Sequence, residues 1–178
     1  MSRQGSMRAL RLVAPQPGVD HAPAEWVWFC GHCGERPKGT DAPAPDARVC
    51  EGCGLGLLLE TQADLAPAPG APFLLVDDRL RVHGISAAAE RLLGLTESEA
   101  SGRPIGEMLV SPDAEAARGG GLAALVADIA SGGDAPTRTF VRPWNTFGVR
   151  LRAQISACGP PRAALIVLGG SPPLRAVR

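Results

Sequence analysis

The residues of this sequence best suited to chemistry are four cysteines arranged in two close pairs. Cys30 and Cys33 form the first Cys-x-x-Cys pair, Cys50 and Cys53 form the second, and a glycine directly follows each pair. One such turn places two sulfurs on the same side of an ion, and the other turn supplies the opposite pair of a tetrahedral site. The spacing therefore predicts a single structural zinc ion. Iron in a rubredoxin-like site and a redox-active pair of dithiols remain as alternatives.

No catalytic role is expected for this site or for the other polar residues. Catalytic zinc keeps one coordination position open for water, whereas four cysteines complete the tetrahedron, so His32 between them is interpreted as an exposed loop residue. Cys158 stands alone and is interpreted as a small apolar filler rather than a reactive thiol. The sequence contains no nucleophile elbow, phosphate loop, carboxylate pair or zinc-protease motif. We therefore assign no catalytic residue and expect a protein that is not an enzyme.

Length and composition predict a cytoplasmic protein of two modules. The 178 residues suffice for one ordinary domain and a small additional module. The 18 basic residues balance 18 acidic residues, so no overall field draws the chain to nucleic acid or to an anionic membrane. No apolar run is long enough for a secretory signal or a membrane span. The pairing of the cysteines suits metal binding better than disulfide formation, which favours a reducing compartment.

The elements around the cysteines are predicted to form a zinc ribbon, in which two turns at the tips of hairpins are clamped by one ion. Residues 25–29 have the aromatic and β-branched composition of a strand and lead into the first pair. Residues 35–47 are too rich in proline and charge for a core element and are expected to form an exposed loop. Residues 55–60 leave the second pair as another extended segment. The predicted organisation is a flexible arm over 1–22, the ribbon over 23–60, a Pro/Ala linker over 61–72, the main domain over 73–170 and a tail over 171–178.

From Phe73 onward, the pattern predicts an α+β domain with its helices grouped on one face of an antiparallel sheet. A short apolar strand over 73–76 and a strand of alternating polar and apolar residues over 79–85 indicate a hairpin. Ser86 is a good N-cap for a helix that Gly94 ends, and Thr96 opens a capping box. The later predicted elements are a short helical stretch over 104–109, an amphipathic helix over 122–130 and three strands over 137–142, 147–157 and 163–168.

This order of elements, together with three stretches of the sequence, resembles the PAS domain family over residues 73–169. The stretches are Phe-Leu-Leu-Val-Asp-Asp-Arg-Leu-Arg-Val at 73–82, Ser-Ala-Ala-Ala-Glu-Arg-Leu-Leu-Gly at 86–94 and Glu-Ser-Glu-Ala-Ser-Gly-Arg-Pro at 97–104. Ser86 stands where the family commonly has asparagine, and its hydroxyl can cap the helix but lacks the further hydrogen bonds of an amide. The resemblance implies a PAS-like five-stranded antiparallel sheet that cradles its helices over one face and encloses a small chamber.

Six side chains are expected to face this chamber, and they decide which ligands to expect. They are Leu92, Leu109, Leu125, Ile129, Phe140 and Leu151. Because they are mostly aliphatic, an occupant would be small and apolar, and an ordinarily packed core is the alternative. No haem is expected, since His83 lies on a predicted strand and the helix over 122–130 contains no histidine. No flavin is expected, since the helix after Pro104 contains no cysteine.

The resulting expectation is a PAS-type sensory and regulatory protein with a structural zinc ribbon, acting through protein–protein interaction. The chain ends shortly after the last predicted strand, so its output is expected to pass to a protein partner or through a homodimer. Two alternatives stay open. One is a zinc-ribbon factor that binds nucleic acid or the transcription machinery through Arg36, Lys38 and Arg48. The other is a redox switch in which thiol oxidation releases zinc.

A group of arginines is expected to share one face of the sheet, because they recur at period two on adjacent predicted strands. The group consists of Arg138, Arg142, Arg150 and Arg152. This pattern indicates either an ordinary solvated face or a surface for an acidic partner or nucleic acid. Trp26 and Trp28 are interpreted as packing residues of the ribbon rather than as a platform for stacked bases.

Overall fold

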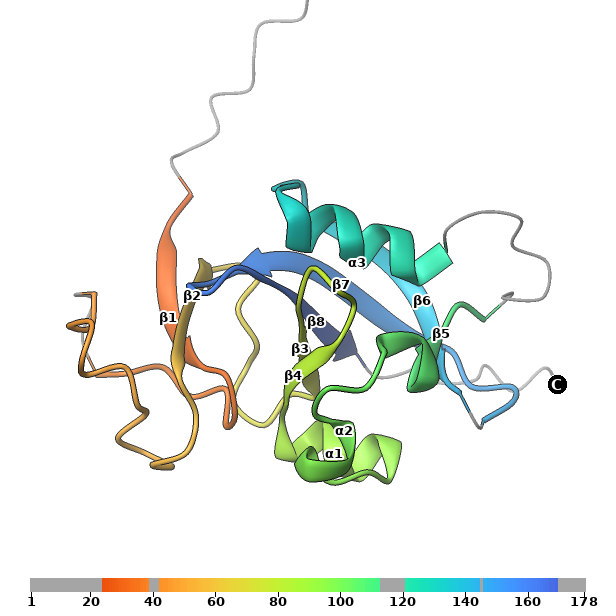
Figure 1. Cartoon of the computed structure of the whole chain (residues 1–178), viewed down its shortest axis with the longest axis horizontal. Helices are drawn as coiled ribbons and strands as arrows, with labels where there is room; N and C mark the ends of the chain where they lie inside the picture. Colours follow the sequence, from red (N-terminus) through yellow and green to blue (C-terminus); the bar gives the residue numbers. More distant parts are fainter. Residues whose placement is uncertain (1–23, 39–41, 113–120, 145, 170–178) are drawn as a thin grey trace, which may run out of the picture.

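A six-stranded antiparallel sheet occupies the middle of the molecule, with helices packed on one of its faces and a two-stranded hairpin on the other (Figure 1). The computed structural model describes residues 24–38, 42–112, 121–144 and 146–169. The predicted arm and tail lie outside the described residues. The α+β class and the antiparallel sheet are confirmed. No helix in these described ranges is long and apolar enough to cross a membrane.

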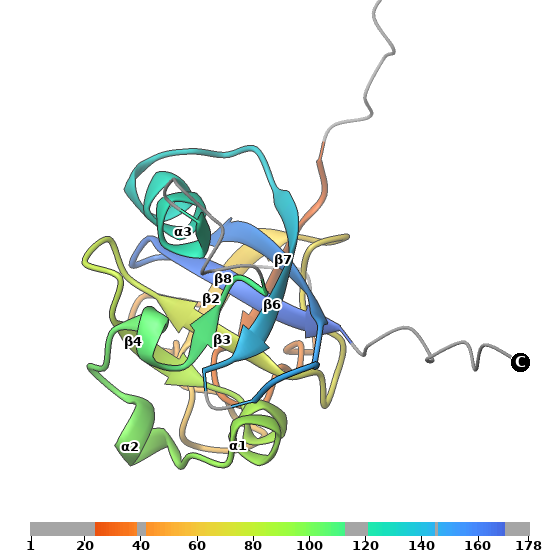
Figure 2. The ribbon, with the colours of Figure 1, turned by 90° about the vertical axis from the view of Figure 1, so that its right-hand side faces the viewer.

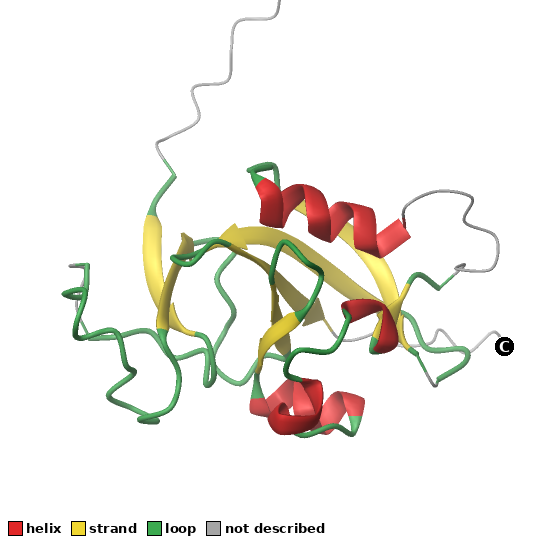
Figure 3. Ribbon diagram, viewed as in Figure 1, coloured by secondary structure: helices red, strands yellow, loops and turns green. Residues whose placement is uncertain are grey.

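The hairpin precedes the main sheet in the sequence, and few helices accompany the strands (Figure 3). The hairpin consists of β1 (Trp26–Cys30) and β2 (Leu58–Gln62). The main sheet consists of β3 (Phe73–Val76), β4 (Val82–Ile85), β5 (Leu109–Val110), β6 (Thr137–Pro143), β7 (Leu151–Cys158) and β8 (Ala163–Gly169). The helices are α1 (Ala87–Leu93), α2 (Glu97–Ala100), the single 3-10 turn η1 (Ile105–Glu107) and α3 (Gly121–Ser131).

The strands of the main sheet lie in the order β4-β3-β8-β7-β6-β5, so the first hairpin of the domain joins its last strand through β3 and β8. The side view shows α3 at one end of the curled sheet and α1 with α2 at the other (Figure 2). The sixth strand, β5, is an addition to the five expected. A helical stretch through Leu109 was predicted, but η1 ends at Glu107, and the chain then extends so that Leu109 pairs with Pro143 of β6.

The predicted helix boundaries around α1 and α2 are confirmed, because side-chain caps fix them locally. The Ser86 hydroxyl accepts a hydrogen bond from the Ala89 N–H, and Gly94 ends α1 in the left-handed conformation at φ 67°. Thr96 and Glu99 form the capping box of α2. The Ser86 hydroxyl also accepts from the Phe73 N–H at 3.0 Å and donates to the Ala71 carbonyl at 3.0 Å. One hydroxyl therefore both caps α1 and ties it to the start of β3.

The alternating side chains of the sheet strands build a separate core on each face, as the pleat requires. On one face, Leu74, Ile155 and Ile166 pack with buried residues of all the helices. On the other face, Phe73, Leu75 and Leu165 pack with residues of the β1–β2 hairpin. The helices therefore cover one face, and the hairpin takes part of the opposite face for its own core.

The segment predicted as a linker belongs largely to the packed structure. Strand β2 continues to Gln62, Leu65 is only 5% exposed and Pro67 is buried. The chain therefore crosses from the hairpin to β3 while lying against the sheet, and apolar burial rather than proline stiffness alone sets its course.

Two of the six residues expected to face an interior chamber point outward instead. Leu92 is 41% exposed because Ala89 and Leu93, one turn apart, occupy the buried side of α1. Phe140 is 44% exposed because its neighbour Val141 takes the inward position on β6. The remaining four join the helix-facing core, with Leu109, Ile129 and Leu151 buried and Leu125 partly buried against them.

Candidate metal centre

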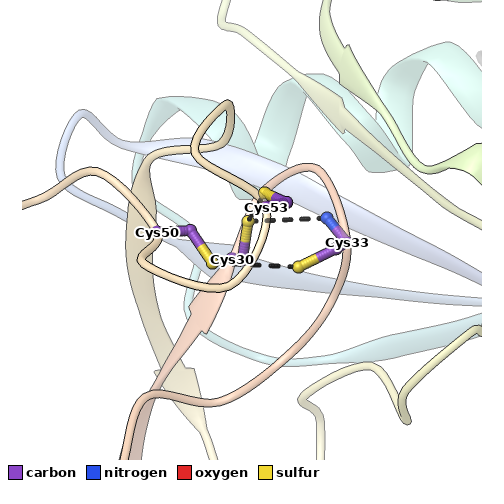
Figure 4. Close-up of side chains that lie close together, drawn as sticks. All are labelled: Cys30, Cys33, Cys50 and Cys53. Atoms are coloured by element: carbon purple, nitrogen blue, oxygen red, sulfur yellow. Dashed lines mark hydrogen bonds between the residues drawn. The ribbon is translucent and has the colours of Figure 1, made fainter.

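Four cysteine sulfurs converge between the two turns of the ribbon, as predicted from the spacing (Figure 4). Cys30 Sγ lies 3.6 Å from Cys53 Sγ, and Cys33 Sγ lies 3.9 Å from Cys50 Sγ. All four sulfurs lie within 4.8 Å of one another. Sulfurs placed 2.3 Å from a central ion at tetrahedral corners would be about 3.8 Å apart. The cysteines are free thiols rather than disulfides, and their arrangement fits one tetrahedral metal ion.

The two turns that carry the sulfurs are built alike. The Gly34 N–H donates to the Cys30 carbonyl at 2.9 Å, and the Gly54 N–H donates to the Cys50 carbonyl at 2.8 Å. Both glycines are in the left-handed region, at φ 76° and 67°. A side chain at either position would be strained, which explains the glycine after each Cys-x-x-Cys pair. The repeated sequence motif thus becomes a repeated backbone structure.

Backbone N–H groups and burial act on the thiols in opposite directions. The N–H groups of Gly56 and then Leu55 stabilise the Cys53 thiolate and lower its pKa to about 6. Burial raises the pKa of Cys30 to about 12, although the N–H groups of Cys33 and His32 partly oppose this rise. Burial also raises the pKa of Cys33. A metal ion bound here would require Cys30 and Cys33 to lose their protons, whereas the Cys53 thiolate is already favoured by its backbone N–H partners.

The other residues singled out in the sequence lie outside this ligand set. His32 is only 21% exposed, so the expectation of an exposed loop residue is wrong; its Nδ1 lies 3.5 Å from Oε2 of Glu97 in α2. His83 is 64% exposed and contacts Asp77, with 3.0 Å between His83 Nε2 and Asp77 Oδ2. Cys158 is 4% exposed and burial raises the pKa of its thiol to about 12, which fits a packed, unreactive thiol.

Sequence reasoning did not predict that the ribbon packs directly against the main sheet. The backbones of Glu60 and Gly159 exchange two hydrogen bonds, at 2.6 and 3.0 Å. The buried Thr61 hydroxyl donates to the Ala157 carbonyl at 2.8 Å. The ring of Phe29, next to the ligand Cys30, meets the ring of Phe73 edge to face at 6.0 Å. The candidate metal centre is therefore joined to the main sheet through both backbone and core contacts.

One ribbon cation takes part in this attachment, and a second binds the segment that follows β2. Arg48 lies over the ring of Trp28 at 5.2 Å and donates to the Pro160 carbonyl at 3.3 Å. Arg36 donates to the Ala63 carbonyl at 3.2 Å. Trp28 packs beside the buried Cys30 and Cys50 as expected for a ribbon packing residue. Trp26 differs from that expectation, because its side chain is 53% exposed.

Comparisons with known proteins leave the family open. No family model and no curated protein matches the sequence. Among solved structures, the crystal structure of the E. coli DhaR(N)–DhaL complex contains a similar chain, with a TM-score of 0.40 and 17% sequence identity. The similarity covers 61% of this chain and 34% of that chain. This protein thus spans about a third of the length of the chain it matches.

Proposed function

We propose that this protein is a PAS-type regulatory protein that binds a structural zinc ion and acts by binding another protein rather than by catalysis. The observation that carries the proposal is the closed site of four cysteines. It lies on a hairpin that packs against the face of the main sheet opposite the helices. The order of two strands, short helices, the two-residue strand β5, a longer helix and three strands supports the PAS assignment. Four thiolates would fill every position around a tetrahedral ion and leave none for a substrate, which supports a structural role.

Zinc is the ion that this donor set favours for a structural site. Tetrahedral sets of four thiolates hold zinc or iron, and closed sets of four cysteines are characteristic of structural zinc. The metal would hold the two ribbon turns together, and Cys30 would pass this restraint directly to Phe29 in the core shared with the sheet. A protein partner is proposed rather than nucleic acid, since the chain carries no net charge and Arg36 and Arg48 are each held against a backbone carbonyl.

The test of the zinc site is metal analysis of protein purified without added metal, with native mass spectrometry of the same sample. We expect one zinc ion per chain and no absorbance from iron. The Cys33→Ser variant should lose most of the metal, while Cys158→Ala should keep it, because Cys158 lies outside the cluster. Recovery of less than half an equivalent of zinc from the unmodified protein would overturn the assignment.

The test of partner binding is cross-linking of the metal-loaded protein in a lysate of its native host, followed by identification of the captured chains. We expect one partner protein to be enriched reproducibly, and to bind again as a purified protein. Capture of the protein alone contradicts this part of the proposal. Native mass spectrometry then distinguishes a homodimer from a monomer.

A further inference from the structure

The outer face of the main sheet stays open beyond the edge of the ribbon. The β1–β2 hairpin covers β3 and one end of β7 and β8, while the other end of the sheet forms a groove with a volume of about 470 Å³. Leu65 and Ala66 form one wall of this groove. Its floor is formed by residues of β6, β7 and β8, namely Arg138, Thr139, Phe140, Arg152, Ala153, Gln154, Val167 and Gly169. We call this surface the outer groove.

The strand register places the outward side chains of the groove in two rows. Arg138 lies opposite Gln154, which lies opposite Val167. In the next row, Phe140 lies opposite Arg152, which lies opposite Gly169. Arg138 and Arg152 are consequently diagonal neighbours on two adjacent strands, and such diagonal positions have their Cα atoms about 7 to 8 Å apart. Because Gly169 has no side chain, the second row is open beside Arg152.

The outer groove is positively charged, and its charges are free to bind a ligand. Arg138 and Arg152 are exposed, and neither guanidinium has a hydrogen bond or ion pair within the described part of the chain. No acidic residue belongs to the described lining of the groove. Arg142 differs, because its guanidinium donates to the carbonyls of Trp144 and Thr146. The predicted arginine face therefore contains two arginines that are free to bind, Arg138 and Arg152.

The charge and spacing of these arginines select one kind of occupant. A second copy of the chain would place arginines against arginines, which like-charge repulsion disfavours. Nucleic acid is favoured by many cations along a strand, typically about 6 to 10 phosphate contacts, whereas this groove offers two. Acidic side chains at positions i and i+2 of an extended peptide are about 6.6 Å apart, which is close to the spacing of the two arginines. The exposed ring of Phe140 offers apolar contact beside them.

We propose that the outer groove binds an extended acidic segment of the partner protein, whose Glu-x-Glu or Asp-x-Asp carboxylates contact Arg138 and Arg152. An apolar residue next to this pair would lie against Phe140. This inference rests on the proposed function, because it names the class of partner that the regulatory protein recognises. It confines recognition to the part of the sheet that the ribbon leaves open.

The test uses the full metal-loaded chain and an array of fluorescein-labelled peptides that carry Glu-x-Glu with varied flanking residues, read out by fluorescence anisotropy. We expect saturable binding that weakens with salt and that falls about tenfold when Gln-x-Gln replaces Glu-x-Glu. The double variant Arg138→Glu, Arg152→Glu should lose binding to a similar extent. Arg91→Glu on α1, another exposed arginine, should bind like the unmodified protein. Zinc content and melting temperature check that each variant is folded.

Three results of the peptide experiment would overturn the proposal. They are equal binding of the Glu and Gln peptides, unchanged binding by the double variant, and tighter binding of a single-stranded oligothymidine at the same arginines. A dimer that dissociates in the double variant would show that the groove binds a second copy instead. If the host partner is captured equally by the unmodified protein and the double variant, the groove proposal fails while the proposed function stands. If neither captures a partner, the proposed function itself fails.

Discussion

At the scale of single residues, Gly56 shows how closely the backbone surrounds the four clustered cysteines. Its N–H stabilises the Cys53 thiolate, and its carbonyl accepts a hydrogen bond from the Cys50 N–H at 2.8 Å. A Cβ atom at Gly56 would collide with Cys30 Sγ and would lie 2.7 Å from Cβ of His32. Space rather than backbone conformation therefore requires glycine here.

Replacement of Gly56 by alanine should weaken metal binding, because the new methyl group displaces Cys30 Sγ. We expect an affinity loss of about tenfold or more, similar to the loss of a group that orients a ligand. Competition with a chromophoric zinc chelator measures the affinity. Gly106→Ala is the matched control, since a Cβ there meets nothing within 4 Å. Equal zinc affinities for the two variants would contradict this reading.

The turn between β3 and β4 is stabilised by the ionised carboxylate of Asp77, so its stability depends on pH. Burial opposes ionisation of its carboxyl, but the N–H groups of Arg81 and Arg79 and the ring of His83 outweigh burial, so the pKa of Asp77 lies below its usual value. A carboxyl whose pKa is lower in the folded state stabilises the fold at pH values above its unfolded pKa. This stabilisation is lost as the pH falls through the lower, folded pKa.

Asp77→Asn should therefore lower the free energy of unfolding by about 1 kcal/mol at neutral pH, because a neutral amide accepts weaker hydrogen bonds than a carboxylate. The difference from the unmodified protein should shrink as the pH falls through the folded pKa of Asp77. Denaturant unfolding at a series of pH values measures it, and acid loss of metal affects both proteins alike. Asp78→Asn is the control. A difference that grows toward low pH would be inconsistent with the assigned direction.

At the scale of secondary structure, β1 joins the candidate metal centre to the core. Cys30 is its last residue, and the preceding Phe29 is fully buried between the hairpin and the sheet. Trp26 on the same strand is 53% exposed. The two aromatic residues thus share a strand but differ in surroundings, which makes them a matched pair.

Phe29→Ala should destabilise the metal-loaded protein by about 3 to 5 kcal/mol, since it leaves a cavity where two layers meet. Trp26→Ala should cost much less, because water already reaches its ring. Urea unfolding followed by circular dichroism compares the two variants. Similar losses for both would show that the hairpin does not share its core with the sheet.

Much of the secondary structure could be predicted, because residues close together in the sequence determine where the helices and turns begin and end. The caps at Ser86 and Thr96 and the stop at Gly94 are determined by neighbouring residues, and the helices begin and end there. The Cys-x-x-Cys-Gly turns are local in the same sense. Strand β5 could not be predicted so readily, because pairing with a distant strand determines it. The outward position of Phe140 is different, since it lies two residues from Arg138 and from Arg142 on one strand and shares their face. The predicted strand over 147–157 begins only at Leu151, after Gly148 at φ 74°.

At the scale of the whole molecule, the helices, the main sheet and the β1–β2 hairpin form three layers. One hydrophobic core lies on each face of the sheet. The sequence separates the ribbon from the main domain by a proline-rich segment and thus suggests two independent modules. The structure instead places Leu59 of the ribbon in one cluster with Leu75 and Leu165 of the sheet. Burial of apolar surface between distant parts of the chain determines this arrangement, and composition alone does not reveal it.

The metal-loaded protein should therefore unfold in a single transition, and removal of the metal should lower the melting temperature of the whole fold. Differential scanning calorimetry before and after treatment with a strong chelator measures both. The reason is that a relaxed ribbon withdraws Phe29 and Leu59 from the core they share with the sheet. Readdition of zinc should restore the original curve. Two well-separated transitions in the metal-loaded protein would instead indicate independent modules.

The contacts of the ribbon also differ in how far apart their residues lie in the sequence, which orders their formation during synthesis. The contact between the Cys30 and Cys53 sulfurs spans 23 residues, whereas the bond from Thr61 to Ala157 spans 96 and that from Arg48 to Pro160 spans 112. Local contacts form soon after their residues leave the ribosome, and distant contacts wait for the rest of the chain. The cysteine site can thus take up its ion while most of the sheet is still untranslated. Until β7 and β8 emerge, the side of the hairpin that carries Phe29 lacks its contacts with Cys158, Ala163 and Leu165.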